Sequence, residues 1–177
     1  MTLSNTNELN NYETLTEVKK LDPQENDLFD VIIIGAGPSG MSAGICASRA
    51  DLKTLIIEKT MPGGECSTAC KIDNFIGQPS GILGEELGRN MEEQLFTHDI
   101  CYTCETVIDF KHLSGPIKTV VTSLGKEYRT KTLILAIGLE PKPLNSDFEQ
   151  RFLGFGISYY AQSDPSLYKD KNVVVIG

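Results

Sequence analysis

The sequence predicts an α/β fold that opens with a βαβ unit and continues into a small β-meander. Three observations lead to this prediction. Residues 30–58, "DVIIIGAGPSGMSAGICASRADLKTLIIE", pass from a β-branched run through glycines into apolar and small residues at helical spacing, then end on a second apolar run. Short β runs follow later in the chain. The closing stretch "KNVVVIG" repeats the pattern of "DVIIIG" and predicts the truncated start of a second unit of the same type.

Composition excludes several classes of protein. The 177 residues are enough for one domain of about 100–150 residues and part of another. A formal net charge of −8 argues against non-specific binding to nucleic acid or anionic membrane, because both are themselves anionic. Five cysteines, an odd number, predict a reducing, cytoplasmic setting. Residues 1–28 are polar and predict a disordered tail, and no apolar run approaches the roughly 18 residues of a membrane span.

The middle of the chain predicts a loop and then a helix. Residues 61–80 contain several prolines and glycines, which break any regular period. In residues 83–96, Leu87, Met91 and Leu95 stand four apart with Glu and Arg between them. This spacing predicts an amphipathic helix.

The second half of the chain predicts the meander and a domain boundary. Residues 99–110, 117–124 and 127–137 read as three β runs, and "TLILAIG" in the last is apolar enough for a buried strand. The stretch "LEPKPLNSD" resembles a linker. We therefore expect a first domain segment over residues 29–142, and a linker with an incomplete second domain over residues 143–177.

The glycines of the βαβ unit predict a dinucleotide site. Gly35, Gly37 and Gly40 form G-x-G-x-x-G directly after a strand and before a helix. The first glycine permits the tight turn, the second lets backbone approach a pyrophosphate, and the third allows close helix–sheet packing. Glu58 follows the second strand, where an acid can accept hydrogen bonds from both ribose hydroxyls. The alternative is a glycine-rich turn that binds no ligand.

These residues also resemble a known family. The βαβ string, the glycine pair in "MPGGE", "IDNFIGQPSGILGEELGRNMEEQ" and "TLILAIG" together resemble the FAD domain of low-molecular-weight thioredoxin reductases, over about residues 29–177. The resemblance implies a Rossmann-like FAD-binding domain with the glycine turn on the pyrophosphate and Glu58 on the adenosine ribose. The residues that it implies for FAD binding are Gly35, Gly37, Pro38, Ser39, Gly40, Glu58, Lys59, Gly63, Gly64, Glu65, Asn74, Ala136 and Gly138.

One departure from this family concerns its redox chemistry. Thioredoxin reductases of this type carry a redox C-x-x-C shortly before the second nucleotide strand. Tyr160 and Ser163 stand at the two matching positions here, and neither side chain can form a disulfide. The family's usual electron path through those positions is therefore not implied for this chain.

A second cysteine pair, Cys66 and Cys70, follows the glycine pair in "GGECSTAC". Residues four apart on one helical face have Cα atoms about 6 Å apart, within the range of a strained disulfide. Lipoamide dehydrogenase and glutathione reductase place a pair at a similar position, with one residue more between the cysteines. Two interpretations stay open: a redox-active dithiol beside the flavin, with Lys71 stabilising a thiolate, or two small apolar residues that line the pocket.

The remaining cysteines are expected to be structural. Cys101 and Cys104 lie in a β run, where positions i and i+3 face opposite sides, and no second ligand pair stands at a spacing suited to zinc. We expect both to pack in the core and predict no metal site. Cys46 lies among small residues of the first helix and is expected to be buried.

The resemblance and the residues together predict an FAD-dependent oxidoreductase that passes electrons to a protein or small-molecule disulfide. Of the two open interpretations of Cys66 and Cys70, the redox-active dithiol would make this pair the route. NADPH and ferredoxin remain alternative electron donors, and the acceptor is expected to be a thioredoxin-like protein or a small disulfide. A homodimer in the cytoplasm, without nucleic-acid or membrane partners, completes the prediction. The alternatives are a ferredoxin–NADP reductase-like flavoprotein without a dithiol and a truncated, non-catalytic flavin-binding fragment.

Overall fold

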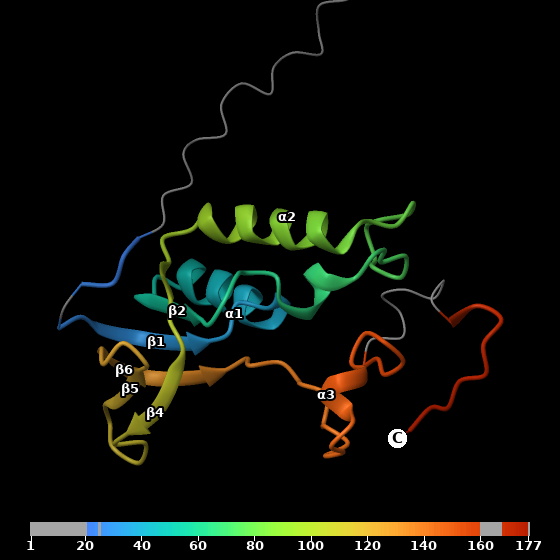
Figure 1. Ribbon diagram of the computed structural model, residues 1–177. Helices are drawn as coiled ribbons and strands as arrows, with labels where there is room; N and C mark the ends of the chain where they lie inside the picture. Colours follow the sequence, from blue (N-terminus) through green and yellow to red (C-terminus); the bar gives the residue numbers. More distant parts are fainter. Residues whose placement is uncertain (1–20, 25, 160–167, 177) are drawn as a thin grey trace, which may run out of the picture.

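A computed structural model of the chain describes residues 21–24, 26–159 and 168–176 (Figure 1). The predicted α/β class is confirmed, because strands and helices alternate around one mixed sheet. The elements in chain order are β1 (Leu28–Ile34), α1 (Pro38–Arg49), β2 (Thr54–Glu58), the 3-10 helix η1 (Gly64–Thr68), α2 (Gly84–Phe96), β3 (Cys101–Cys104), β4 (Val107–Lys111), β5 (Lys118–Thr122), β6 (Glu127–Leu135) and α3 (Glu149–Phe152).

Six strands form the sheet in the order β3-β2-β1-β6-β5-β4. β1 pairs in parallel with β2 and with β6, so that Ile33 lies between Ile56 and Ile134. β2 also pairs in parallel with β3, whereas β4, β5 and β6 are antiparallel and form the meander. The parallel order of β1 and β2 follows from the α1 crossover between them.

Residues 99–110, expected to be one β run, form two strands with different partners. β3 extends the parallel part of the sheet, and β4 starts the meander at its other edge. Only Glu105 and Thr106 separate them. The chain therefore turns sharply at a point that an unbroken run of β-forming residues does not reveal.

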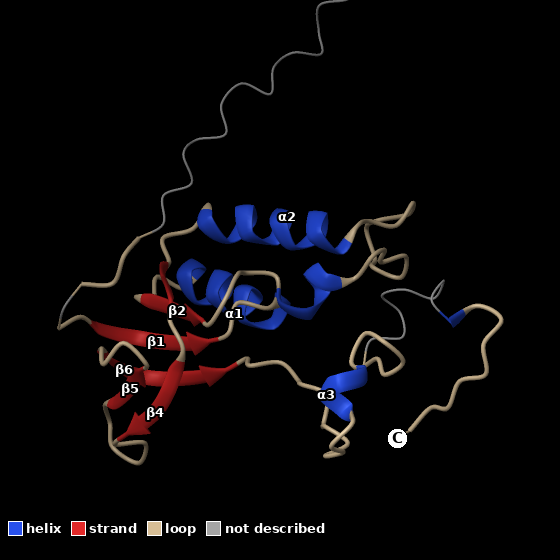
Figure 2. Ribbon diagram, viewed as in Figure 1, coloured by secondary structure: helices blue, strands red, loops and turns tan. Residues whose placement is uncertain are grey.

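The core has two parts, one on each face of the parallel strands. Because successive side chains of a strand face opposite sides, Val31 and Ile33 of β1 pack with the helices, whereas Ile32 and Ile34 pack with the meander. Figure 2 shows α1 and α2 together on one side of the strands. Val120 of β5 and further meander residues complete the second cluster. The layers are thus helices, parallel strands and meander.

The predicted boundary of the disordered tail, residue 28, lies too far along the chain, because ordered contacts begin at Leu21. Leu21 forms a parallel bridge with Cys101, and its carbonyl accepts a hydrogen bond of 2.9 Å from the Tyr102 amide. β1 itself begins at Leu28. These contacts tie residues 21–24 and 26–28 to the sheet, while residues 1–20 lie outside the described part of the chain.

The expected strand in "KNVVVIG" does not form within the described residues. Residues 173–176 adopt no regular secondary structure, and Val174 and Val175 are 87% and 86% exposed. A strand needs a hydrogen-bonded neighbour, and none of the described segments lies beside this one. Tyr160 and Ser163 lie outside the described residues. None of the described helices has the length and apolar character needed to cross a membrane.

Candidate functional site

The turn between β1 and α1 is packed against the end of β6. Gly35 has φ +102, a conformation that favours glycine, and its amide donates to Ile57 O at 2.8 Å. A Cβ on Gly35 would lie 2.9 Å from the carbonyl carbon of Ala136 and nearer still to its oxygen. A Cβ on Gly40 would overlap the Gly35 carbonyl in the same way. Gly35, Gly40 and Ala136, all predicted site residues, are therefore brought together.

Gly37 has room for a Cβ, in contrast to Gly35 and Gly40, its two neighbours in the motif. The nearest heavy atom to a Cβ built on Gly37 is the Gly64 Cα, at 3.9 Å. Gly37 is the N-cap of α1, and Pro38 and Ser39 follow in its first turn. Amide groups at the start of a helix lack partners within the helix and, with the dipole, attract an anion. The residues present thus fit a pyrophosphate next to Gly37.

Glu58 anchors the glycine turn through its side chain. One carboxylate oxygen, Oε2, accepts a hydrogen bond of 2.6 Å from the Ala36 amide. The other, Oε1, accepts from the amide of Thr60 at 3.0 Å and from its hydroxyl at 3.2 Å. A carboxylate offers about four acceptor positions, so roughly one remains for a ribose hydroxyl. The expectation that Glu58 serves both hydroxyls therefore requires the Thr60 hydroxyl to turn away.

The second glycine pair lies against the first. The Gly63 amide donates to Ala36 O at 2.9 Å, and φ is +112 at Gly63 and +57 at Gly64. A Cβ on Gly64 would lie 3.0 Å from the Gly37 Cα. The two glycine turns, far apart in sequence, therefore form one surface, and η1 starts from it.

Two further glycines that sequence reasoning missed fix η1 from the other side. The Gly84 amide donates to Ala69 O at 3.0 Å, and a Cβ on Gly84 would lie 3.0 Å from the Ala69 nitrogen and closer still to carbonyl oxygens of the same turn. A Cβ on Gly88 would lie 3.2 Å from the Ser67 Cβ and would overlap its Oγ. The sequence did carry a signal for this contact: Gly84 and Gly88 stand four apart in a predicted helix and so share one helical face, where another segment can approach closely.

The shared helical face expected for Cys66 and Cys70 is wrong. η1 ends at Thr68, and Ala69 is extended with ψ 131, so Cys70 lies beyond the helix. Cys66 is half-buried, whereas Cys70 and Lys71 are exposed. The relative position of the two thiols is therefore set by an extended residue rather than by helical periodicity.

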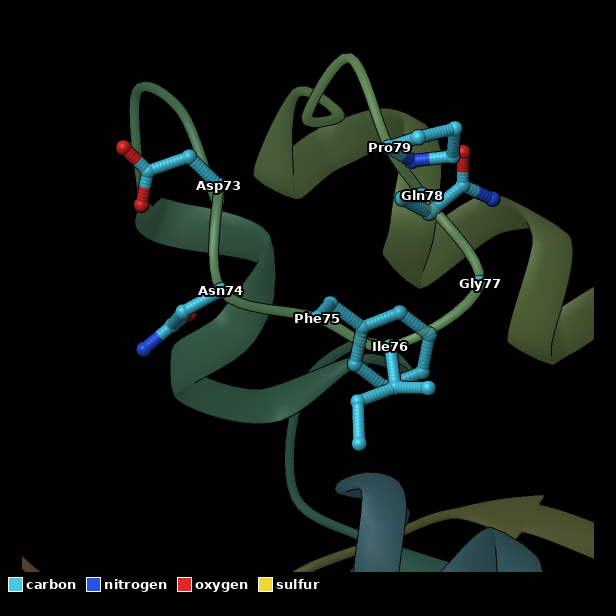
Figure 3. Close-up of a pocket in the computed structure, with 7 residues that line it drawn as sticks. All are labelled: Asp73, Asn74, Phe75, Ile76, Gly77, Gln78 and Pro79. Carbon is cyan, nitrogen blue, oxygen red and sulfur yellow. The ribbon is translucent and has the colours of Figure 1, made fainter.

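The remaining predicted cofactor residues lie at the margin of this surface. Asn74 belongs to a loop, residues 73–79, that lines a shallow pocket and is closed by paired hydrogen bonds between Ile72 and Ile82 of 2.7 and 2.8 Å. Figure 3 shows the Asn74 amide pointing away from the Phe75 and Ile76 side chains.

Three other predicted residues are exposed around the same surface. Lys59 forms an ion pair with Glu140 at 2.6 Å, and that carboxylate raises the pKa of Lys59. Glu65 is exposed in η1, and Gly138, with φ +70, is exposed beyond β6. They border the glycine turns without adding a buried polar contact to them.

Two of the three cysteines expected to be structural are not in the core. Cys46 is exposed because the buried residues of α1 are Gly40, Met41 and Gly44, and position 46 lies on another side of the helix. Cys104 is also exposed, and its thiol donates to Thr60 O at 3.0 Å. Cys101 is half-buried, and burial raises the pKa of its thiol. Among the described residues no group of histidine, cysteine and acidic side chains is arranged to bind a metal ion.

Comparison with known proteins identifies the family. The family profile described as pyridine nucleotide-disulphide oxidoreductase matches residues 29–177. The chain belongs to this family. Among curated relatives of this oxidoreductase chain, thioredoxin reductase of Bacillus subtilis (strain 168) is 40% identical over 156 residues, covering 86% of this chain and 48% of the relative. The chain spans about half the length of most of the curated relatives that it matches.

Solved structures of relatives show the same fold. Thioredoxin reductase of Lactococcus lactis is 32% identical with a TM-score of 0.70, over 78% of this oxidoreductase chain and 45% of that structure. The ferredoxin-flavin thioredoxin reductase of Clostridium acetobutylicum is 30% identical with a TM-score of 0.58, over 80% and 48%. These likenesses confirm the predicted Rossmann-like architecture with its meander.

Proposed function

We propose that this chain contributes the FAD-binding part of a thioredoxin reductase-like disulfide reductase. The observation that carries the proposal is the single surface formed by the two glycine turns, with room for a Cβ at Gly37 and the Glu58 carboxylate bound to the Ala36 amide. Gly37, Pro38 and Ser39 would hold the pyrophosphate, and Glu58 a ribose hydroxyl. Residues 29–142 are the proposed first segment of this domain, and residues 143–177 lead into a second.

Bound FAD would supply two-electron transfer at its ring. Cys66, half-buried on the helix that starts from the glycine surface, would face the cofactor, and the exposed Cys70 would face the acceptor. Two electrons and two protons convert a Cys66–Cys70 disulfide to two thiols. Attack of one thiolate on the acceptor's disulfide, followed by closure of the pair, returns the disulfide and releases the acceptor as a dithiol.

The experiment is a thiol count on the complete gene product loaded with FAD. Two-electron reduction should expose two new thiols that map to Cys66 and Cys70. Cys66→Ser and Cys70→Ser should abolish reduction of a thioredoxin-type disulfide while FAD stays bound. Cys46→Ser is the matched control. Cys46 is exposed in the last turn of α1, at the end away from the glycine turn, so its substitution should leave the rate unchanged. An unchanged rate in the Cys66/Cys70 double variant would favour the reductase without a dithiol.

The electron donor is either NADPH or a ferredoxin, and the solved relative from Clostridium acetobutylicum bears ferredoxin in its name. The proposed acceptor is a thioredoxin-like protein or a small disulfide, in keeping with the names of the relatives. We place the protein as a homodimer in the cytoplasm, where reducing conditions suit its five cysteines. The two donors are separated by adding NADPH alone to the FAD-loaded protein: reduction of the bound flavin indicates NADPH as donor, and no reduction indicates ferredoxin.

A further inference from the structure

A buried carboxylate at the end of β3 has no part in the dinucleotide turn. Glu105 is 5% exposed, and its two oxygens accept four side-chain hydrogen bonds. The donors and distances are Thr103 Oγ1 at 2.9 Å, Thr122 Oγ1 at 2.6 Å, Lys126 Nζ at 2.8 Å and Tyr128 Oη at 2.8 Å. The hydrogen-bonding capacity of this buried charge is filled, so removing the carboxylate would leave several hydrogen-bond donors without their acceptor at once.

The donors to Glu105 come from elements that the strand order separates. Thr122 ends β5 and Tyr128 lies on β6, whereas Glu105 follows β3 at the other edge of the sheet. The carboxylate therefore joins the meander to the end of the parallel strands, at the sharp turn between β3 and β4.

The backbone of the same residue holds the strand that carries Glu58. The Glu105 amide donates to Glu58 O at 2.9 Å, one step beyond the last β2–β3 pair, Glu58 with Cys104. The Glu58 side chain in turn accepts from the Ala36 amide of the glycine turn. One continuous set of hydrogen bonds thus runs from the meander through Glu105 and Glu58 to the turn.

We infer that Glu105 is a positioning residue for Glu58: by fastening the meander to the end of β2, it keeps the Glu58 carboxylate on the Ala36 amide and turned toward the ribose of the cofactor. This inference rests on the proposed function, because it assigns Glu105 a role in FAD affinity.

The ionisation of Glu105 supports its role in positioning Glu58. Burial raises the pKa of Glu105, but hydrogen bonds from Lys126, Thr122, Tyr128 and Thr103 outweigh it and bring the pKa to about 2. Lys126 pairs with it as a cation, and Tyr128 stays neutral because burial and Glu105 raise its pKa. Glu105 is therefore an anion throughout the physiological pH range, and its four hydrogen bonds to Thr103, Thr122, Lys126 and Tyr128 are fully formed there.

The test is a double-mutant cycle on FAD affinity, measured by titration of flavin fluorescence at pH 7 with the complete gene product. Glu105→Gln should weaken binding about tenfold, since a charged hydrogen-bond acceptor is lost. If Glu105 acts through Glu58, the same change in a Glu58→Gln background should cost less than about twofold. Glu127→Gln, which breaks an exposed ion pair with Lys111 on the same meander, is the control and should change affinity less than about twofold.

Losses of affinity that add in the cycle would overturn the inference, because Glu105 would then affect FAD binding independently of Glu58. Lys126→Met keeps the test decisive if Glu105→Gln does not fold, because it removes one exposed donor and leaves the carboxylate in place. It should weaken binding about threefold, and only where Glu58 is present. No loss, or an equal loss in both backgrounds, contradicts the inference. Wild-type protein that binds no FAD overturns the proposed function as well.

Discussion

Gly37 and Gly40 belong to one sequence motif, yet the structure predicts different effects for alanine at the two positions: a large loss of stability at Gly40 and weaker FAD binding at Gly37. A Cβ on Gly40 would lie 2.9 Å from the Gly35 carbonyl carbon, closer still to its oxygen, and 3.4 Å from the Ala136 Cβ. Backbone cannot rotate out of the way, so α1 must move off the sheet. Overpacking of this kind costs about 3 kcal/mol, at the upper end of the usual range.

The cost at Gly37 is far smaller. Its φ of −72 and ψ of 178 suit alanine, and the nearest atom to the new Cβ is 3.9 Å away. Alanine is a poorer N-cap than glycine but restricts the unfolded chain, and the two effects offset to within about 0.5 kcal/mol. Gly37→Ala should instead weaken FAD binding, because the methyl group enters the space beside the pyrophosphate.

Urea denaturation followed by circular dichroism measures both effects, since the chain has no tryptophan to report by fluorescence. With a slope of about 2 kcal/mol per molar urea for a protein of this size, Gly40→Ala should lower the midpoint by about 1.5 M, and Gly37→Ala by less than about 0.3 M. Equal shifts in the two variants, or a Gly40→Ala midpoint within about 0.3 M of wild type, would refute the assignment of separate roles.

Two further predictions concern buried polar groups. Glu105→Gln should lower the free energy of unfolding by about 2 kcal/mol at pH 7. The folded pKa of about 2 lies below 4.5, the ordinary value for glutamate, so this contribution is complete above about pH 4.5 and is lost as the pH falls toward 2. The variant and wild type should therefore converge in urea titrations at low pH. Ser67→Ala should raise the midpoint, because the buried Ser67 Oγ has no hydrogen-bond partner among the described residues. Removing a buried hydroxyl without a partner is worth about 1 kcal/mol; a lower midpoint would contradict this.

Local pattern was enough to predict the βαβ unit and its glycine turn. The strand, turn and helix of residues 28–49 are set by β-branched residues, glycines and Pro38, all close in sequence. The turn at Glu105 was not predictable in this way. Three of the four side-chain donors to Glu105, namely Thr122, Lys126 and Tyr128, lie 17 to 23 residues away and reach it only when the meander folds onto the parallel strands.

The errors at individual cysteines have a similar cause. Cys46 was placed in the core from composition alone, whereas Gly40 and Gly44, four apart, already mark the side of α1 that meets the sheet. Cys104 follows the alternation of a strand, but its side chain points to the exposed end of the sheet, where it meets the Thr60 carbonyl. Burial at a strand end depends on what lies beyond the strand, which periodicity does not describe.

The place of Cys66 follows from close approaches of backbone on both sides of η1. Gly63 donates to Ala36 O, and Gly64 lies against Gly37, so η1 starts from the proposed phosphate turn. On the far side, Gly84 and Gly88 of α2 leave no room for a side chain between the two helices. Cys66 is thereby held at a fixed distance from the turn, whereas Cys70 follows the extended Ala69 and is exposed. The proposed electron transfer from FAD to an external disulfide needs one thiol held near the cofactor and one thiol that the acceptor can reach. Cys66 and Cys70 are arranged in this way.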